Sequence, residues 1–137
     1  MTVFETKIAL VLCDDLAGWQ ALNVTAFLTS GIVAQTPDII GEPYIDFAGN
    51  RFNPLTIQPM IVLAADRETL RVIHRRALER GIVTSAYIEE MFSTGHDAAN
   101  RAAFAEFSPD TAKIVGIGLR ADKRIVDRVT KGARMHP

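Results

Sequence analysis

The sequence predicts an α/β protein, arranged as a three-layer α/β/α sandwich with a mixed, mostly parallel sheet of about four strands and a β-hairpin at its periphery. The first observation behind this prediction is the length of 137 residues, which suits a single domain with one core over residues 1–137. The second is that apolar runs of strand length alternate with segments of helical periodicity. The third is that no internal repeat or low-complexity linker interrupts this alternation.

The chain opens with a predicted strand and helix. Residues 7–13, KIALVLC, form a nearly continuous apolar run, which is typical of a strand buried on both faces. Asp14 and Asp15 end this run. From Trp19 onward apolar residues recur every three or four positions, so we expect a helix that ends near Gly31.

A hairpin is predicted over residues 44–53, because Ala48, Gly49 and Asn50 supply a turn between two short segments. A lone hairpin cannot bury large apolar side chains against itself. This one carries Tyr44, Ile45, Phe47 and Phe52. We therefore expect these side chains to need a partner surface, and we predict a homodimer.

The centre of the chain repeats the strand and helix pattern. Residues 59–65, PMIVLAA, predict a second strand. Asp66 is placed to accept hydrogen bonds from the first backbone N–H groups of a helix that ends at Gly81. Residues 82–88 predict a third strand.

The last predicted strand and helix cover residues 113–119 and 121–132, with Gly132 ending the helix. Gly116 and Gly118 lie on the same face of this strand, which indicates that a helix or another backbone approaches closely there. The third glycine of a dinucleotide-binding fingerprint is missing, so we predict no nucleotide cofactor.

Composition limits the partners that we expect. With 15 basic and 16 acidic residues the net charge is −1, so we do not expect nucleic acid as a partner. Arg67, Arg71 and Arg75 share one helix face, where they would contact phosphates or form a solvated face with weak ion pairs.

No apolar run reaches the roughly 20 residues that a membrane helix needs, and there is no export signal and only one cysteine. We expect a cytoplasmic protein with no membrane partner.

The stretch SAYIEEMFSTGHD, residues 85–97, carries the densest group of reactive side chains. If residues 88–94 are helical, Glu90 and Thr94 lie one turn apart on a shared face. A carboxylate beside a hydroxyl can position a water, so this is a candidate hydrolytic pair. Alternatively, Thr94 and Asp97 form a capping box for a helix over residues 98–107. The two roles do not exclude each other.

Two further residues have reactive side chains. Cys13 ends the first strand and would be a nucleophile if its pKa were lowered, but a buried structural thiol is the simpler interpretation. His96 and Asp97 are metal-capable, yet no second histidine stands at ligand spacing. We predict neither a metal nor a cofactor.

Taken in order, the motifs resemble the peptidyl-tRNA hydrolases of the archaeal and eukaryotic type. The segments that carry this resemblance are KIALVLCDDL, PMIVLAADRETLRVIHRRALERGI, YIEEMFSTG and KIVGIGLRADKRIVDRVTKG, and together they span most of the chain. The resemblance implies a single α/β domain with a pocket after the third strand.

The chain departs from those hydrolases where their catalytic lysine is expected. The corresponding segment, AGWQALNVTAF, contains no lysine, and Asn23 stands nearest its place. Glu90 replaces the aspartate of the family, while Thr94 matches in kind. Without the cation we predict no efficient hydrolysis of peptidyl-tRNA. The segment WQALNVTAFLTSGI and the hairpin look instead like a branch of uncharacterised short bacterial proteins in the same superfamily, and we place the chain there.

Two functions are therefore predicted as alternatives. In the first, the protein hydrolyses a small ester or amide: Glu90 and Thr94 position water, Asn23 donates to the oxyanion and Asp15 shapes the pocket. In the second, the same pocket belongs to a noncatalytic module that binds an unknown small molecule or dimerises.

Overall fold

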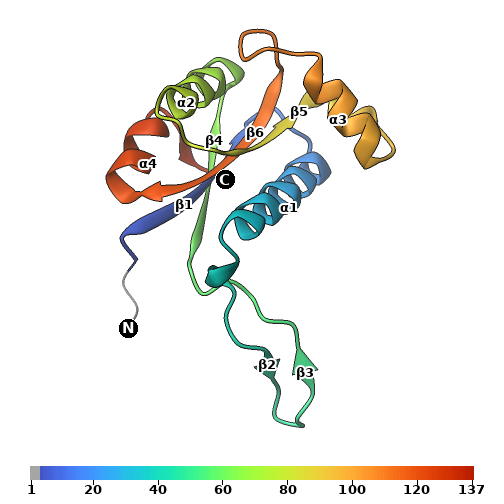
Figure 1. The fold of residues 1–137 in the computed structure, drawn as a ribbon, viewed down its shortest axis with the longest axis vertical. Helices are drawn as coiled ribbons and strands as arrows, with labels where there is room; N and C mark the ends of the chain where they lie inside the picture. Colours follow the sequence, from blue (N-terminus) through green and yellow to red (C-terminus); the bar gives the residue numbers. More distant parts are fainter. Residues whose placement is uncertain (1–3) are drawn as a thin grey trace.

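The computed structural model describes residues 4–137, so the first three residues of the predicted domain lie outside the described part. Figure 1 shows a sheet with helices packed on it and a long hairpin that projects from one end. In chain order the elements are β1 Thr6–Cys13, α1 Gly18–Gln35, η1 Pro37–Ile39, β2 Tyr44–Ile45, β3 Arg51–Phe52, β4 Met60–Ala65, α2 Arg67–Glu79, β5 Ser85–Ile88, η2 Glu89–Ser93, α3 Asp97–Ala105, β6 Ile114–Asp122, α4 Lys123–Val129 and β7 Arg134–Met135. None of the helices in this part of the chain is long and apolar enough to cross a membrane.

The main sheet confirms the α/β class and corrects its details. Five strands lie in the order β5-β6-β1-β4-β7. Strands β1 and β4 are parallel, but β6 runs antiparallel to both β1 and β5, and β7 runs antiparallel to β4. The sheet is mixed as predicted and contains the four predicted strands together with the two-residue edge strand β7, whereas the prediction that it is mostly parallel is wrong. An apolar run reports that both faces of a strand are buried, but it carries no information on strand direction.

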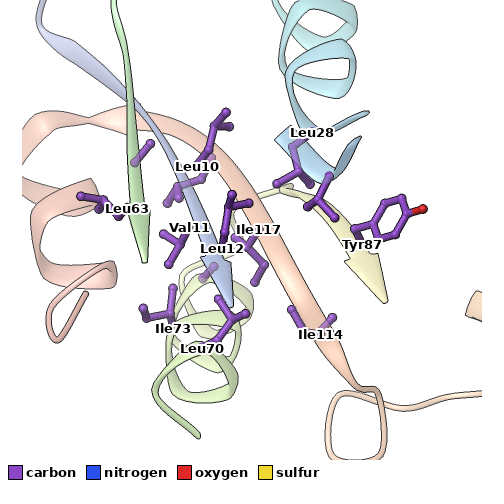
Figure 2. Packing of buried hydrophobic residues seen from close by; sticks show 14 of the residues in the cluster. Leu10, Val11, Leu12, Leu28, Leu63, Leu70, Ile73, Tyr87, Ile114 and Ile117 are labelled. Carbon is purple, nitrogen blue, oxygen red and sulfur yellow. The ribbon is translucent and has the colours of Figure 1, made fainter. Parts of the chain in front are cut away.

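Helices cover both faces of this sheet. Helix α1 packs over β6 where Gly116 and Gly118 leave room, because a Cβ at Gly116 would overlap Cγ1 of Val24 and lie 3.1 Å from Cδ1 of Leu28. The predicted close approach at these glycines is thus confirmed. Figure 2 shows Leu28 of α1 and Leu70 of α2 reaching the sheet from opposite sides. The predicted three-layer arrangement holds.

Several predicted element boundaries differ from the structure. The last helix covers Lys123–Val129 instead of residues 121–132, because strand β6 continues to Asp122. Helix α1 continues to Gln35 instead of ending near Gly31. Gly31 lies against Ser85 of β5, where a Cβ would overlap the serine side chain, so this glycine permits packing and does not end the helix. The third predicted strand begins at Ser85 rather than at residue 82. By contrast, Asp66 caps α2 as predicted, accepting from Thr69 N at 2.7 Å.

The predicted hairpin over residues 44–53 is confirmed. Tyr44 pairs with Phe52, and Ile45 pairs with Arg51. The turn is held by Asp46, whose Oδ1 accepts from the backbone N–H groups of Ala48 and Asn50 at 3.0 and 2.9 Å. We refer to residues 41–57, which contain this hairpin, as the arm.

Candidate functional site

The segment after β5 adopts a 3-10 turn, so the α-helix considered for residues 88–94 does not form. Thr94 follows that turn, and its hydroxyl donates to the carbonyl oxygen of Met91 at 2.9 Å and also contacts Oδ1 of Asn100. The predicted capping box is wrong. Helix α3 is capped by His96, whose Nδ1 accepts from Ala99 N at 3.2 Å, because Thr94 is committed to the preceding turn.

A cavity of about 330 Å³ brings together two of the predicted site residues, Asn23 from α1 and Thr94. Aromatic rings form much of its wall. The ring of Phe92 lies 5.1 Å from that of Tyr87 and 5.7 Å from that of Trp19. The full lining is Trp19, Asn23, Phe27, Tyr87, Met91, Phe92, Thr94, Gly95, His96, Asp97 and Asn100. The cavity is therefore built from α1, the end of β5, η2 and the start of α3.

The charged and titratable groups of this cavity are already engaged. The carboxylate of Asp97 accepts from Nε of Arg101 at 2.7 Å. His96 uses Nδ1 as the helix cap. Burial raises the pKa of Tyr87, so its hydroxyl keeps its proton at neutral pH. The lining residues include no lysine or arginine. What the cavity offers is aromatic surface with amide and hydroxyl groups.

Two hollows continue from the cavity along α1. One, of about 420 Å³, runs toward Phe104 and Ala105 of α3, and the other, of about 370 Å³, runs along β5. Phe27 and Met91 line all three spaces. A ligand seated among the rings can therefore extend over an apolar surface.

The other two predicted site residues lie outside this cavity. Glu90 is absent from its lining, and its Oε2 is buried with no hydrogen-bond partner among residues 4–137. Asp15 lies in a separate group, where Nε of Arg67 donates to its Oδ2 at 2.8 Å. The four predicted residues thus do not line one cavity.

The group around Asp15 is a cluster of charges that sequence reasoning did not find. Arg67, at the start of α2, also pairs with Glu89 at 2.9 Å, and Lys113 lies 3.8 Å from the same carboxylate. Hydrogen bonds from Arg67 and then from Cys13 hold the pKa of Asp15 below its ordinary value. These side chains are two-fifths to one-half exposed or more, so the ion pairs add little stability. The sequence places Arg67 directly after β4 and Asp15 directly after β1, but only the parallel pairing of these two strands brings the side chains together.

The arginine row along α2 forms surface contacts. Arg75 pairs with the carboxylate of Asp110 at 2.9 Å, and Arg71 donates to the carbonyl oxygen of the same residue at 2.7 Å. Both arginines are exposed. These contacts support the interpretation of the arginine row as a solvated helix face with weak ion pairs. No group of three or more His, Cys, Asp or Glu side chains within the described range is arranged to hold a metal ion.

We expect the thiol of Cys13 to be inert in the folded protein. Its side chain is 1% exposed and donates to Oδ1 of Asp15 at 3.1 Å. Burial, followed by this hydrogen bond, raises the pKa of the thiol from 9.0 to about 11. A two-unit shift lowers the thiolate population at pH 8 by roughly a hundredfold. In a dithionitrobenzoate assay the native protein should react at least a hundred times more slowly than the protein in 6 M guanidinium.

The same shift predicts a pH dependence of stability, because the folded state holds the thiol proton more tightly than the unfolded state. Stability from this group is fully present below pH 9 and is lost as the pH rises toward about 11. A Cys13→Ala control should lack this component. Rapid labelling of the native wild type at pH 8 would show that Cys13 is reachable and would contradict the structural role.

Comparisons with known proteins agree with the fold. The profile of a family described as protein of unknown function (DUF2000) matches residues 6–137. A solved structure of a protein of unknown function from Agrobacterium tumefaciens strain C58 is 69% identical, with a TM-score of 0.97. The match covers 98% of this chain and all of that one. No curated protein matches.

Proposed function

We propose that this chain, which belongs to the DUF2000 family of proteins of unknown function, is a noncatalytic module that binds a small uncharged molecule with a flat ring. One observation carries the proposal: Asn23 and Thr94 share a cavity with four aromatic side chains, while Glu90 and Asp15, the carboxylates considered for hydrolysis, do not line it. The ligand sits between α1 and the segment from η2 to α3.

The chemistry of the wall supports this class of ligand. Aromatic side chains give a large apolar contact area and stack on flat rings. The amides of Asn23 and Asn100 can each donate and accept, which suits the polar edge of a heterocycle or a carboxamide. A charged ligand would find no lysine or arginine in the lining, and the one carboxylate there, Asp97, is paired with Arg101.

The family match agrees with the placement in a branch of unknown function, and the Agrobacterium relative agrees with a bacterial origin. The resemblance to peptidyl-tRNA hydrolases stays a prediction, since neither comparison bears on it. The lack of lysine and arginine in the cavity supports the expectation that peptidyl-tRNA is not turned over efficiently.

Hydrolysis of a small ester or amide is the second candidate, and one observation favours it. Oε2 of Glu90 is buried without a partner in the described part of the chain. A buried oxygen of this kind is costly unless it serves a role, and holding a water beside a substrate would be such a role. In this candidate reaction Thr94 and Asn23, which line the cavity, contact the substrate, and Glu90, which does not line it, acts through the water.

The binding proposal predicts that Asn23→Leu loses ligand affinity. Thermal-shift screening of the wild type against flat heterocycles and carboxamides should give at least one specific stabilisation. Removing one buried hydrogen-bonding group costs about 1–3 kcal/mol, so Asn23→Leu should weaken that ligand by roughly 10- to 100-fold in calorimetry. Thr25→Val is the matched control, because Thr25 lies on the same helix, bonds Ala21 O at 2.7 Å and does not line the cavity.

An ester and amide turnover screen separates the two candidates. Turnover that disappears in Glu90→Gln, with the fold intact, would establish the hydrolase and overturn the noncatalytic module. No turnover together with saturable binding, weakened by Asn23→Leu and unaffected by Thr25→Val, is the expected result.

We also propose that the binding module is a homodimer. The apolar residues of the hairpin stay exposed in the single chain: Tyr44 at 55%, Ile45 at 65%, Phe52 at 54% and Phe47 fully. The sheet of the same chain does not cover them, so a second copy is the partner that the sequence analysis anticipated.

A further inference from the structure

The arm is a large feature of the molecule that the cavity does not use. It leaves the body between η1 and β4 and extends away from the helices and the main sheet (Figure 1). At its base Gly41 N donates to Leu55 O at 2.9 Å, and farther out only two residue pairs join β2 to β3. A two-stranded hairpin of this kind is marginally stable in water unless it packs on something.

The arm exposes a large apolar surface. Six of its side chains are more than half exposed, namely Tyr44, Ile45, Phe47, Phe52, Leu55 and Ile57. At the usual area of large apolar side chains they total roughly 700 Å², shared between the two faces of the hairpin because neighbouring strand residues point to opposite sides. Exposed apolar area on this scale is typical of a surface that binds a partner.

The arm keeps its position in the Agrobacterium relative. The two structures match with a TM-score of 0.97 over 98% of the chain, and an arm pointing elsewhere would lower that value substantially. A segment that holds one extended position without packing on its own body is most simply held by another molecule.

Each copy also carries an uncovered surface at the base of its arm. Strand β7 pairs only with Leu63 and Ala64 of β4, so the edge of Met60 and Ile61 lies beyond its last pair. A hollow of about 500 Å³ opens here. Its lining is Lys7, Ile8, Pro59, Met60, Ile61, Val62, Met135 and His136. Met135 is 63% exposed, so this surface is apolar and accessible.

We propose that two copies associate through antiparallel arms, so that Phe47 at the tip of each arm docks in the hollow at the base of its partner. This arrangement rests on the proposed homodimer and specifies its interface. At about 3.3 Å per residue Phe47 at the tip lies roughly 20 Å from Gly41 at the base of its own arm, so it cannot fill that hollow itself. A two-fold axis across the arms brings each tip to the other base, as an interface between identical surfaces requires.

The area available suits this seating. If both faces of each arm are covered, two arms bury up to about 1,400 Å² of apolar surface, against about 1,200–2,000 Å² for stable interfaces. Charge adds little, because Lys7 in the receiving hollow already pairs with Asp127 of its own chain at 2.7 Å. Tyr44 and Phe52 would meet their counterparts near the axis.

Sedimentation velocity tests the interface. The wild type should be a dimer at 10 μM, and Phe47→Asp or Phe52→Asp should make it monomeric. Replacing one central aromatic side chain of an interface commonly weakens binding by about 30-fold. Each substitution occurs twice in a symmetric dimer, so we expect the affinity of dimerisation to fall roughly a thousandfold. Leu22→Asp is the matched control, because Leu22 is 75% exposed on α1 and should leave the dimer intact. Circular dichroism checks that each variant is folded.

A cross-link tests the antiparallel seating. Phe47→Cys combined with Met135→Cys should give a disulfide-linked dimer under mild oxidation, and each single variant should give far less. Cys13 adds no background because it is buried. A wild type that stays monomeric at 100 μM, or a dimer that survives Phe47→Asp, would overturn the proposal. A missing cross-link in a dimer would overturn the seating. Neither result alters the ligand test, since Asn23 lies outside the arm.

Discussion

Replacing Leu10 by alanine is expected to lower the free energy of unfolding by about 4 kcal/mol, within the range measured for buried leucines. Leu10 is 1% exposed and lies in β1, the central strand, with Val62 of β4 on one side and Gly118 of β6 on the other. Because it fills the space between the sheet and α1, its removal leaves a cavity that a glycine cannot fill.

Chemical denaturation at pH 7 measures this effect, and the midpoint of thermal unfolding should fall by roughly 15 °C for a chain of this size. Leu22→Ala, on the exposed surface of α1, should change stability by no more than about 0.5 kcal/mol. A loss below about 1 kcal/mol for Leu10→Ala would show that the core of β1 is less tightly packed than described.

Introducing valine at Gly116 should destabilise the protein by about 3 kcal/mol, through overlap instead of a cavity. A Cβ at this position would collide with Cγ1 of Val24, which lies within α1 and is fully buried. Neither β6 nor the helix can move without disturbing the rest of the sheet, so the strain stays in the folded state.

A double substitution separates this mechanism from a general intolerance of the strand. Gly116→Ala should cost about 1–2 kcal/mol, and adding Val24→Ala should cost less in that background than in the wild type, because the colliding methyl groups are gone. Gly18→Ala is the control, since nothing lies within 4 Å of the Cβ that it adds. Simple additivity of the two changes would contradict close packing of α1 on β6.

The amino-acid sequence by itself determined the elements and their burial. The run from residue 7 to 13 identified the central strand, Asp66 identified the start of α2, and Gly116 with Gly118 identified the strand beneath a helix. These features are local: they depend on apolar periodicity, on a capping side chain and on the space left by a missing Cβ. The turn at Asp46 to Asn50 is another local feature of this kind.

Only the tertiary structure decided how the strands are ordered and which reactive side chains meet. The direction of β6 depends on how the chain returns after α3, and a pattern of apolar residues is the same in either direction. Asn23 and Thr94 are far apart in the chain but line one cavity, whereas Glu90, only four positions before Thr94, does not. The 3-10 turn of η2 causes this separation, because it changes the direction of each side chain relative to the expected α-helix. The spacing of two residues along the chain predicts that their side chains are neighbours only when the secondary structure between them is known.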